Sequence, residues 1–368
     1  MMIAYDAEHL RDYMAEAARI SPDYPVYLDR FLEGAIESDV DALCDGEEVY
    51  IGGILEHIEE AGIHSGDSAT CIPPFSFSES LQTKLRETTR RIAMALGVRG
   101  LVNVQYAIKG ETVYVIEANP RASRTVPFIS KATGVPLAKC AARIMAGDSI
   151  ASLGLPSDER QLEWFCMKEA VMPWGRFPGA DVILGPEMKS TGEVMGIAKS
   201  YPEAYAKTQL AIDYKLPDPS AGKVFISVCD RDKRHILSVA RILRYLGFDI
   251  CSTEGTARVL RGGNVTCEVV EKISGPHDGE RPNIGDLIAD GKIAVIINTP
   301  YGPGSRGDGY LLRTEAVRRG VTCVTAMSAA NTYVSAIEAV REDEQGHGSA
   351  NDMGMDVIAL QDLPQYTV

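Results

Sequence analysis

The stretch Leu101–Phe128, LVNVQYAIKGETVYVIEANPRASRTVPF, contains two β-rich runs separated by residues 109–111, Lys-Gly-Glu. A three-residue connection with a central glycine suits a β-hairpin. If the two runs pair directly after this turn, Asn103 lies opposite Glu117 and Gln105 becomes a diagonal neighbour of Glu117. We therefore expect Gln105 and Glu117 on one face of the hairpin, about 7–8 Å apart at Cα.

Oxygen-bearing side chains continue beyond the second run. Asn119 keeps the two-residue period of Glu117, so both side chains can converge with Gln105 on one spot. One carboxylate and two amides form the sparse oxygen set that Mg²⁺ binds together with water and phosphates. Arg121 and Arg124 follow and can clamp phosphate or carboxylate oxygens, so the segment predicts phosphoryl transfer. The alternative is a polar hairpin and a proline-broken loop whose charges are merely solvated.

Length and composition describe an ordinary globular protein. The 368 residues suffice for two or three domains, and 45% are hydrophobic and 24% charged. A net charge of −14 gives no electrostatic argument for nucleic acid or an anionic membrane as a partner. Eight scattered cysteines without C-x-x-C spacing indicate core thiols in a reducing compartment. No signal peptide or membrane-spanning run is visible, which favours a cytoplasmic location.

The first residues predict a strand over 1–5, with Asp6 as the N-cap of the helix that follows. A strand without an earlier partner is expected in the middle of a domain, not at its start. Further strands are expected over 26–32 and 35–43, and the alternation in the second of them places acids on one face, namely Glu37, Asp39 and Asp41. The alternative interpretation of that acidic face is a solvated edge strand.

Residues 56–68, EHIEEAGIHSGDS, concentrate two histidines and four acids. His57 and His64 with these acids can suggest a transition-metal site, but the glycines make their spacing that of a loop, not of a helix with ligands at fixed steps. Residues 148–215 show irregular patterning with repeated Gly-Pro breaks.

Residues 216–222, LPDPSAG, have the proline- and glycine-rich composition of a linker, and after them the pattern changes to alternating strands and helices. Buried strands are expected over 223–229, 248–253 and 293–299, which predicts a doubly wound parallel sheet. Thr253 and Thr256 stand after one strand at a helix N-terminus, where free amides can hold phosphate. Simple N-capping is the alternative for this T-x-x-T pattern.

Four segments resemble the large subunit of carbamoyl-phosphate synthetase, an ATP-grasp enzyme. They are MIAYD at 2–6, LDRFLEGAIE at 28–37, EHIEEAGIHSGDS at 56–68 and IEANPRASRTVPFISKATGVPLAK at 116–139. The resemblance covers essentially the whole chain in one order. It implies an α/β chain in which the C-terminal lobe of an ATP-grasp unit, an antiparallel sheet with helices, precedes a doubly wound methylglyoxal-synthase-like domain. The domains it implies are a partial ATP-grasp domain at 1–147, a connecting subdomain at 148–215, a linker at 216–222 and an allosteric domain at 223–368.

The resemblance also implies roles for individual residues. Metal ions (Mg²⁺ or Mn²⁺, with K⁺ as a further possibility) would be held by Gln105, Glu117 and Asn119, and the transferred group would meet Arg121 and Arg124. ATP would be bound by Arg30, Leu32, Glu37, Gly62, Ile63, His64, Ser65, Gln105 and Glu117. A nucleotide effector, UMP or IMP, would be bound by Lys233, Thr253, Thr256, Lys272 and Asn298. Glu59, Asp67 and Glu169 match positions at which some members bind an amino-acid effector. Pro300 stands where some effector-sensitive members have a residue with a hydroxyl group.

By this resemblance the chain is the C-terminal part of a synthetase large subunit that phosphorylates carbamate with ATP in pyrimidine and arginine biosynthesis. The unit's glycine-rich phosphate loop and the first synthetase half, through which a glutaminase small subunit would act, are expected upstream. The isolated chain is accordingly expected to form no carbamoyl phosphate. The alternatives are a non-catalytic fragment that binds a nucleotide effector and another ATP-grasp ligase, such as a biotin-dependent carboxylase.

Overall fold

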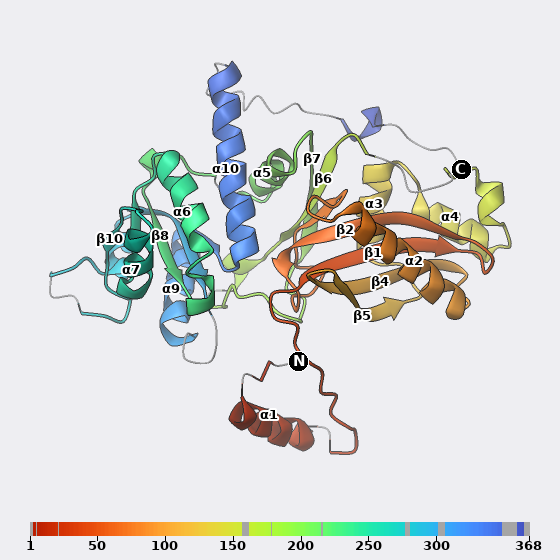
Figure 1. Cartoon of the computed structure of the whole chain (residues 1–368), viewed down its shortest axis with the longest axis horizontal. Helices are drawn as coiled ribbons and strands as arrows, with labels where there is room; N and C mark the ends of the chain where they lie inside the picture. Colours follow the sequence, from red (N-terminus) through yellow and green to blue (C-terminus); the bar gives the residue numbers. More distant parts are fainter. Residues whose placement is uncertain are drawn as a thin grey trace.

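The computed structural model describes residues 3–4, 6–20, 22–156, 162–177, 179–214, 216–276, 280–300, 306–347 and 359–363. These residues build two sheets, one antiparallel and one parallel, with helices packed on both (Figure 1). The predicted α/β architecture of an antiparallel sheet followed by a parallel sheet is therefore confirmed. In the described part of the chain, no helix is long and apolar enough to cross a membrane.

The antiparallel sheet has seven strands in the order β5-β4-β1-β2-β3-β6-β7. Their bounds are β1 Ile36–Cys44, β2 Val49–Glu60, β3 Thr70–Ile72, β4 Gly100–Lys109, β5 Thr112–Asn119, β6 Phe165–Val171 and β7 Gly192–Ala198. The acidic strand β1 lies inside this sheet between β2 and β4, and Asp39 and Asp41 are 1% and 0% exposed. The solvated-edge interpretation of its acidic face is therefore wrong, because β1 is paired on both sides and covered on both faces.

Helices cover the two faces of this sheet differently. Helix α2, Glu79–Ala95, begins at the N-cap Ser78 and packs Leu81 and Leu85 onto one face. Helices α3, Thr125–Thr133, and α4, Leu137–Met145, cover part of the other face. The same face also carries the polar side chains of β1, β4 and β5, and these lie beyond the apolar cluster under α3 and α4. The fold thus gathers these polar side chains beside the apolar cluster on the same face of the sheet.

The hairpin of β4 and β5 forms, but its register differs from the predicted one. Lys109 pairs with Thr112, so the turn has two central residues, and the first of them, Gly110, takes a φ of +59°. Hairpin turns that match strand twist require such a positive φ. A bulge between the pairs of Tyr106 and Gln105 then shifts the pairing by one residue, which sets Gln105 directly opposite Glu117. The predicted diagonal relationship is wrong because sequence periodicity cannot reveal an inserted residue.

In the part of the chain that the structure describes, neither of the two strands predicted before residue 33 is found. Ile3 and Ala4 form no strand, and residues 1, 2 and 5 lie outside the described residues. Residues 26–32 form a loop. Helix α1, Ala7–Ile20, does begin where predicted, with the Asp6 carboxylate accepting from the amides of residues 8 and 9. It buries none of its residues and lies apart from both sheets (Figure 1).

Residues 148–215 are more regular than their sequence indicates. Strands β6 and β7 continue the seven-stranded sheet, and α5, Tyr201–Ala211, begins with a complete capping box between Ser200 and Glu203. Short 3₁₀ turns η1, Ile150–Leu153, and η2, Trp174–Arg176, connect these elements. The alternation in these strands is hidden because β6 is buried on both faces.

The parallel sheet has five strands in the order β10-β9-β8-β11-β12. Its elements are η3 Pro219–Ala221, β8 Lys223–Val228, η4 Asp230–Asp232, α6 Ile236–Tyr245, β9 Ile250–Ser252, α7 Glu254–Gly262, β10 Glu268–Val269, α8 Ile284–Ala289, β11 Ile293–Thr299, α9 Arg306–Arg319, β12 Thr322–Val324 and α10 Met327–His347, with η6 Leu360–Asp362 following. Helices α6 and α10 pack on one face, and α8 and α9 on the other. The predicted doubly wound sheet is confirmed.

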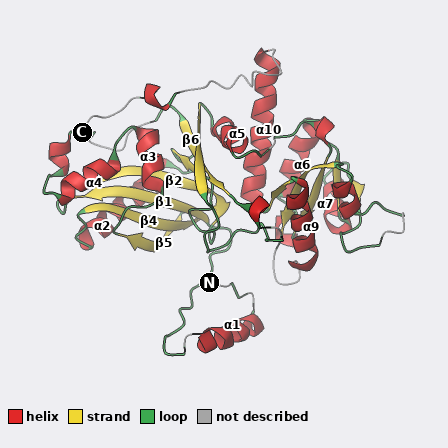
Figure 2. Cartoon of the chain, turned by 180° about the vertical axis from the view of Figure 1, so that it is seen from behind, coloured by secondary structure: helices red, strands yellow, loops and turns green. Residues whose placement is uncertain are grey.

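The two sheets share one hydrophobic core. Helices α5 and α10 lie next to each other between the sheets in both views (Figures 1 and 2). Their cluster joins Met167 of β6 and Tyr205 of α5 to Val224 of β8 and Tyr333 of α10. All eight cysteines are free thiols, and six are buried, as core thiols are expected to be.

Candidate functional site

Two rows of paired residues cross β1, β4 and β5 on the polar face of the antiparallel sheet. One row is Asp39, Gln105 and Glu117, and the other is Asp41, Asn103 and Asn119. Directly paired side chains on one face of a sheet are close neighbours. The structure therefore brings the three predicted metal-binding residues together, beside two buried carboxylates of the central strand.

The hydrogen bonds of the predicted metal-binding residues leave their oxygens available. Asn119 donates through Nδ2 to Oε1 of Glu117 at 2.8 Å, and Gln105 donates through Nε2 to the hydroxyl of Ser65 at 3.1 Å. Both amide oxygens are therefore left to coordinate a cation through their lone pairs, together with the exposed carboxylate of Glu117. This hard donor set fits Mg²⁺ or Mn²⁺.

The two arginines lie in the loop that joins β5 to α3. Arg121 and Arg124 are exposed, and Arg124 is the N-cap residue of α3. Ser123 lies between the two arginines and Thr125 follows the second. Their hydroxyls donate to the two oxygens of Asp41 at 2.6 and 2.5 Å. The buried carboxylate of β1 thus anchors the loop that carries both arginines and directly follows Asn119. Within this loop, Nη1 of Arg121 donates to the carbonyl of Ala122 at 3.1 Å.

The predicted nucleotide-binding residues of the N-terminal part also meet. The amide of Gly62 donates to the carboxylate of Glu37 at 3.3 Å. A Cβ placed on Gly62 would lie 2.9 Å from the ring of Phe31, so the segment containing Arg30 and Leu32 runs beside this glycine. Glycine at this position allows the close approach of the two segments.

The two histidines considered as metal ligands do not share a site. Nδ1 of His64 accepts from the amide of Gly66 at 3.0 Å, within its own loop. Nε2 of His57 instead contacts the carboxylate of Asp39 at 2.9 Å, where both side chains are buried. Among the described residues, no group of three His, Cys, Asp or Glu side chains could hold a metal ion.

The carboxyl groups on β1 are all buried, but their pKa values shift in different directions because their partners differ. Burial raises the pKa of Glu37, and it raises the pKa of Asp41 to about 7 against the hydrogen bonds of Ser123 and Thr125. Burial also works to raise the pKa of Asp39, but the hydrogen bond and charge of His57 outweigh it and lower that pKa. The central strand therefore combines a paired anion with an acid that gains its charge only near neutral pH.

Sequence reasoning missed Lys168, which lies in the middle of β6 and is 1% exposed. Its Nζ donates to the carbonyl oxygen of Ser65 at 3.2 Å, so it holds the loop that carries the predicted nucleotide-binding residues. Burial lowers its pKa. A lysine in the middle of an otherwise buried strand is rare, and this feature could have identified Lys168 as a site residue.

The acids that match amino-acid effector positions lie near this loop but have different partners. Asp67 accepts from the backbone amides of Lys189 and Ser190, whereas Glu59 accepts from the amide of Ala69 at 2.7 Å. Glu169 lies on β6, and its carboxylate accepts hydrogen bonds from the amide of Ala170 and from Nε2 of Gln209. Burial raises the pKa of Glu59 to about 7, and burial with the nearby Glu59 raises the pKa of Glu169 to about 8.

A second candidate site lies at the carboxyl ends of the parallel strands, where the strand order reverses around β8. Thr253 occupies the N-cap position of α7 but makes no capping hydrogen bond, and its hydroxyl contacts that of Ser227 at 3.1 Å. Thr256 is buried and accepts from the amide of Val228 at 3.3 Å. A Cβ placed on Gly255 would lie 3.5 Å from Nζ of Lys233, so this ammonium lies at the start of α7. Thr253 therefore occupies the position that the N-capping alternative predicts, but its hydroxyl does not make the capping hydrogen bond.

The remaining predicted effector residues are tied to α9. Asn298, at the end of β11, donates to the carbonyl of Ser227 and accepts from Arg313, so both of its polar atoms are used within the protein. Lys272 is exposed and pairs with Asp308 at 3.4 Å.

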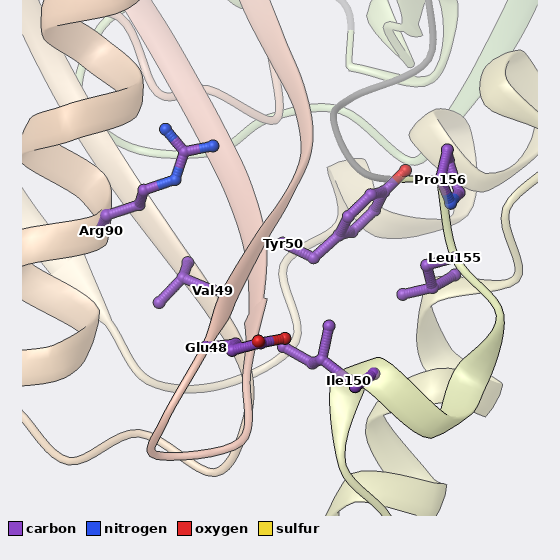
Figure 3. Close-up of a pocket in the computed structure, with 8 residues that line it drawn as sticks. Glu48, Val49, Tyr50, Arg90, Ile150, Leu155 and Pro156 are labelled. Atoms are coloured by element: carbon purple, nitrogen blue, oxygen red, sulfur yellow. The ribbon is translucent and has the colours of Figure 1, made fainter.

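A separate pocket of about 450 Å³ lies at the turn between β1 and β2. It is lined by Glu48, Val49, Tyr50, Arg90, Ile150, Ala151, Leu155 and Pro156, and Tyr50 points toward Leu155 and Pro156 (Figure 3). None of the predicted site residues lines it, so this pocket is distinct from the site on the polar face.

Two parts of the chain match different family models of known proteins. Residues 1–153 match a family model described as the carbamoyl-phosphate synthase L chain, ATP binding domain, and residues 235–325 match the MGS-like domain. The chain is 53% identical to the carbamoyl phosphate synthase large chain of Methanothermobacter thermautotrophicus over 93% of this chain and 32% of the relative. It is 49% identical to a protein named "Carbamoyl phosphate synthase large chain, C-terminal section" from Methanocaldococcus jannaschii, over 94% of this chain and 56% of the relative.

A solved structure that matches shares less sequence with this chain. A biotin carboxylase domain of a thermophilic 2-oxoglutarate carboxylase aligns over 57% of this chain and 54% of that one, with 16% identity and a TM-score of 0.45. The chain spans about a third to just over half of the length of the two sequence relatives described above. On the sequence matches, the chain belongs to the carbamoyl phosphate synthase large chain family and corresponds to its C-terminal part, an ATP-binding domain followed by an MGS-like domain.

Proposed function

We propose that the polar face of the antiparallel sheet binds a divalent metal and ATP and forms part of the site at which carbamate is phosphorylated. The observation that carries this proposal is the direct pairing of Gln105 with Glu117 and of Asn103 with Asn119 across β4 and β5. Bound there, Mg²⁺ or Mn²⁺ would neutralise phosphate charge, held by Gln105, Glu117 and Asn119.

The chain's own residues account for the other requirements of this reaction. Arg121 and Arg124 stand on the anchored loop beside the metal-binding residues, where they would offset charge on the transferred phosphoryl group. Glu37 and the loop at 62–65 would hold the nucleoside, because Gly62 hydrogen-bonds to Glu37 and Ser65 to Gln105.

The isolated chain is expected to bind MgATP without forming carbamoyl phosphate. Glu117, Arg121 and Arg124 are exposed in the described structure, whereas phosphoryl transfer requires a site from which water is excluded. Calorimetric titration with MgATP tests the binding. Glu117→Ala should abolish it, and the control Glu111→Ala, in the exposed turn of the same hairpin, should leave it unchanged.

Two outcomes would contradict this proposal. MgATP binding that is equal in the wild type and in Glu117→Ala would remove the metal-binding assignment. Steady production of carbamoyl phosphate from ATP and carbamate by the 368 residues would refute the expected inactivity.

The parallel domain favours a second function, binding of a nucleotide effector such as UMP or IMP. The supporting observation is that Thr253 leaves the start of α7 uncapped while Nζ of Lys233 lies beside it, which suits a phosphate group. UMP binding measured by calorimetry should be lost in Thr253→Ala and retained in Lys292→Ala. Lys292 pairs with Asp290 at the opposite end of β11, so it is a matched surface control.

A further inference from the structure

Arg313 of α9 is a charged side chain that is 0% exposed and crosses from the parallel domain to the antiparallel one. Its Nε and Nη2 donate to the two oxygens of Asp181 at 2.7 and 2.8 Å. Burial works to raise the pKa of Asp181, but Arg313 outweighs it and holds that pKa below its usual range. A two-pronged pair of this kind, between a fully buried arginine and a partly exposed aspartate, fixes the geometry of both partners.

The third hydrogen bond of Arg313 reaches the candidate effector site. Its Nη1 donates to Oδ1 of Asn298 at 2.9 Å, and Asn298 in turn donates to the carbonyl of Ser227 at 2.9 Å. Ser227 also contacts the hydroxyl of Thr253. One guanidinium group therefore joins the crevice at the ends of β8 and β11 to a carboxylate of the other domain.

Hydrogen bonds continue from Asp181 along the segment that leads to β7. The Asp181 carboxylate accepts from the amide of Ile183 at 3.2 Å, and the carbonyl of Ile183 accepts from Nζ of Lys189 at 2.7 Å. The segment from 181 to 190 is thus organised around the carboxylate that Arg313 holds.

This segment is bonded to the predicted nucleotide loop. The amides of Lys189 and Ser190 donate to the Asp67 carboxylate at 2.7 and 2.9 Å, and the amide of His64 donates to the carbonyl of Gly185 at 2.8 Å. The loop also meets Gln105 and Glu37 through Ser65 and Gly62, as described above. Hydrogen bonds linked by short backbone segments therefore connect Asn298 with the polar face of the antiparallel sheet.

A second arginine ties the beginning of the same loop to the parallel domain. Arg231, in η4, donates to Glu60 at the end of β2 at 3.0 Å and to Glu33 at 3.0 Å. It stands two residues before Lys233 in the candidate effector site. The loop that follows Glu60 is thus tied to the parallel domain directly through Arg231 and indirectly, through residues 181–190, by Arg313.

We propose that Arg313 is a positioning residue that couples the crevice of the parallel domain to the nucleotide loop at 62–68, with Arg231 as a second tie. The inference deepens the proposed function, since it identifies how occupancy of the effector site would reach the ATP site. A ligand that moves Asn298 must move or release the Arg313–Asp181 pair, and the segment bonded to Asp181 carries that change to His64 and Asp67.

Hydrogen exchange measured by mass spectrometry on the full 368-residue chain tests this coupling. Arg313→Lys keeps the charge but loses the two-pronged geometry, so amides at 62–69 and 183–190 should exchange about two- to thirtyfold faster. The matched control is Arg318→Lys, because Arg318 lies on the same helix and pairs with Glu315 of that helix. It should leave exchange at 62–69 unchanged. If Arg313→Lys does not fold, Asp181→Asn, which preserves the shape of the side chain, should give the same acceleration.

Adding UMP distinguishes this inference from the proposed effector function. UMP should slow exchange at 62–69 in the wild type and in Arg318→Lys, but not in a variant of the Arg313–Asp181 pair that still binds UMP by calorimetry. If UMP does not bind the wild type, the effector function fails, and the ligand-free comparison still decides the coupling. Faster exchange confined to 179–185, with 62–69 unchanged in both pair variants, would overturn the inference.

Discussion

Asp39 and His57 form a buried pair across β1 and β2, with 2.9 Å between Oδ2 and Nε2 and side-chain exposures of 1% and 0%. Burial works to lower the pKa of His57, but the hydrogen bond and charge of Asp39 outweigh it and raise that pKa above its ordinary value. The pKa of Asp39 is lowered by the same contact. The polar face thus contains a fixed ion pair next to Gln105, which is paired with Asp39.

Breaking this pair should destabilise the fold in a pH-dependent way. His57 contributes fully below its ordinary pKa of 6.5 and loses its contribution as the pH rises through its higher folded value. Asp39 contributes above 3.8 and loses its contribution as the pH falls through its lower folded value. Asp39→Asn should therefore cost about 3–5 kcal/mol at about pH 5.5 and less at about pH 8.5. Urea unfolding at both pH values measures this.

The control for that measurement is an exposed pair of the same kind. Asp249→Asn removes the surface partner of Arg244 and should cost less than about 1 kcal/mol. Equal losses for the two Asp→Asn variants would show that the buried pair is not formed.

Replacing Glu169 should flatten the alkaline decline in stability. Burial and Glu59 raise the pKa of Glu169 to about 8, so the folded protein keeps a proton that the unfolded chain loses above its ordinary value of 4.5. A raised carboxyl pKa makes stability fall as the pH rises between these values. Urea midpoints should decline less for Glu169→Gln than for the wild type between about pH 6 and about pH 9. Glu203→Gln, whose carboxylate belongs to the half-buried cap of α5, should keep the wild-type slope, and a parallel decline in all three proteins would contradict the prediction.

Thr125→Val should destabilise the loop of the two arginines most strongly at alkaline pH. The Thr125 hydroxyl donates to Asp41, whose pKa is about 7, so its loss leaves an ionised buried oxygen without that donor above neutrality. The expected cost is about 1–3 kcal/mol, smaller below neutral pH where Asp41 is protonated. Thr112→Val, at an exposed site on β5, is the control, and equal urea midpoints for both variants would argue against the anchor.

Gly196→Ala should destabilise the packing of α5 on β7. A Cβ at Gly196 would lie 2.2 Å from the carbonyl oxygen of Ala204 and 3.0 Å from a carbon of Thr208. Since backbone must move to relieve the first contact, we expect a loss of about 1–3 kcal/mol in thermal or urea unfolding. Gly192→Ala, in the same strand, places its Cβ 3.9 Å from Val171 and should change stability little. A similar effect of both substitutions would mean that α5 does not approach the strand this closely.

The sequence by itself predicted those features that depend on local pattern. The hairpin around Gly110, the N-cap at Asp6 and the strand at 293–299 all follow from turn chemistry, capping and periodicity, which act over a few residues. The change to alternating strands and helices after Gly222 likewise predicted the doubly wound sheet. The residue types of the candidate sites could be named for the same reason, since ligand chemistry belongs to the side chain itself.

Tertiary structure alone decided which of these residues meet and in what surroundings. A bulge set Gln105 opposite Glu117, because an inserted residue changes register without changing composition. Neighbouring strands buried the acids of β1, and this burial raises the pKa of Asp41, whereas the contact with His57 lowers that of Asp39. Arg313 and Asp181 lie 132 residues apart and pair only because α9 packs against the other domain. Such contacts depend on the arrangement of whole elements in space, which no local pattern in the sequence records.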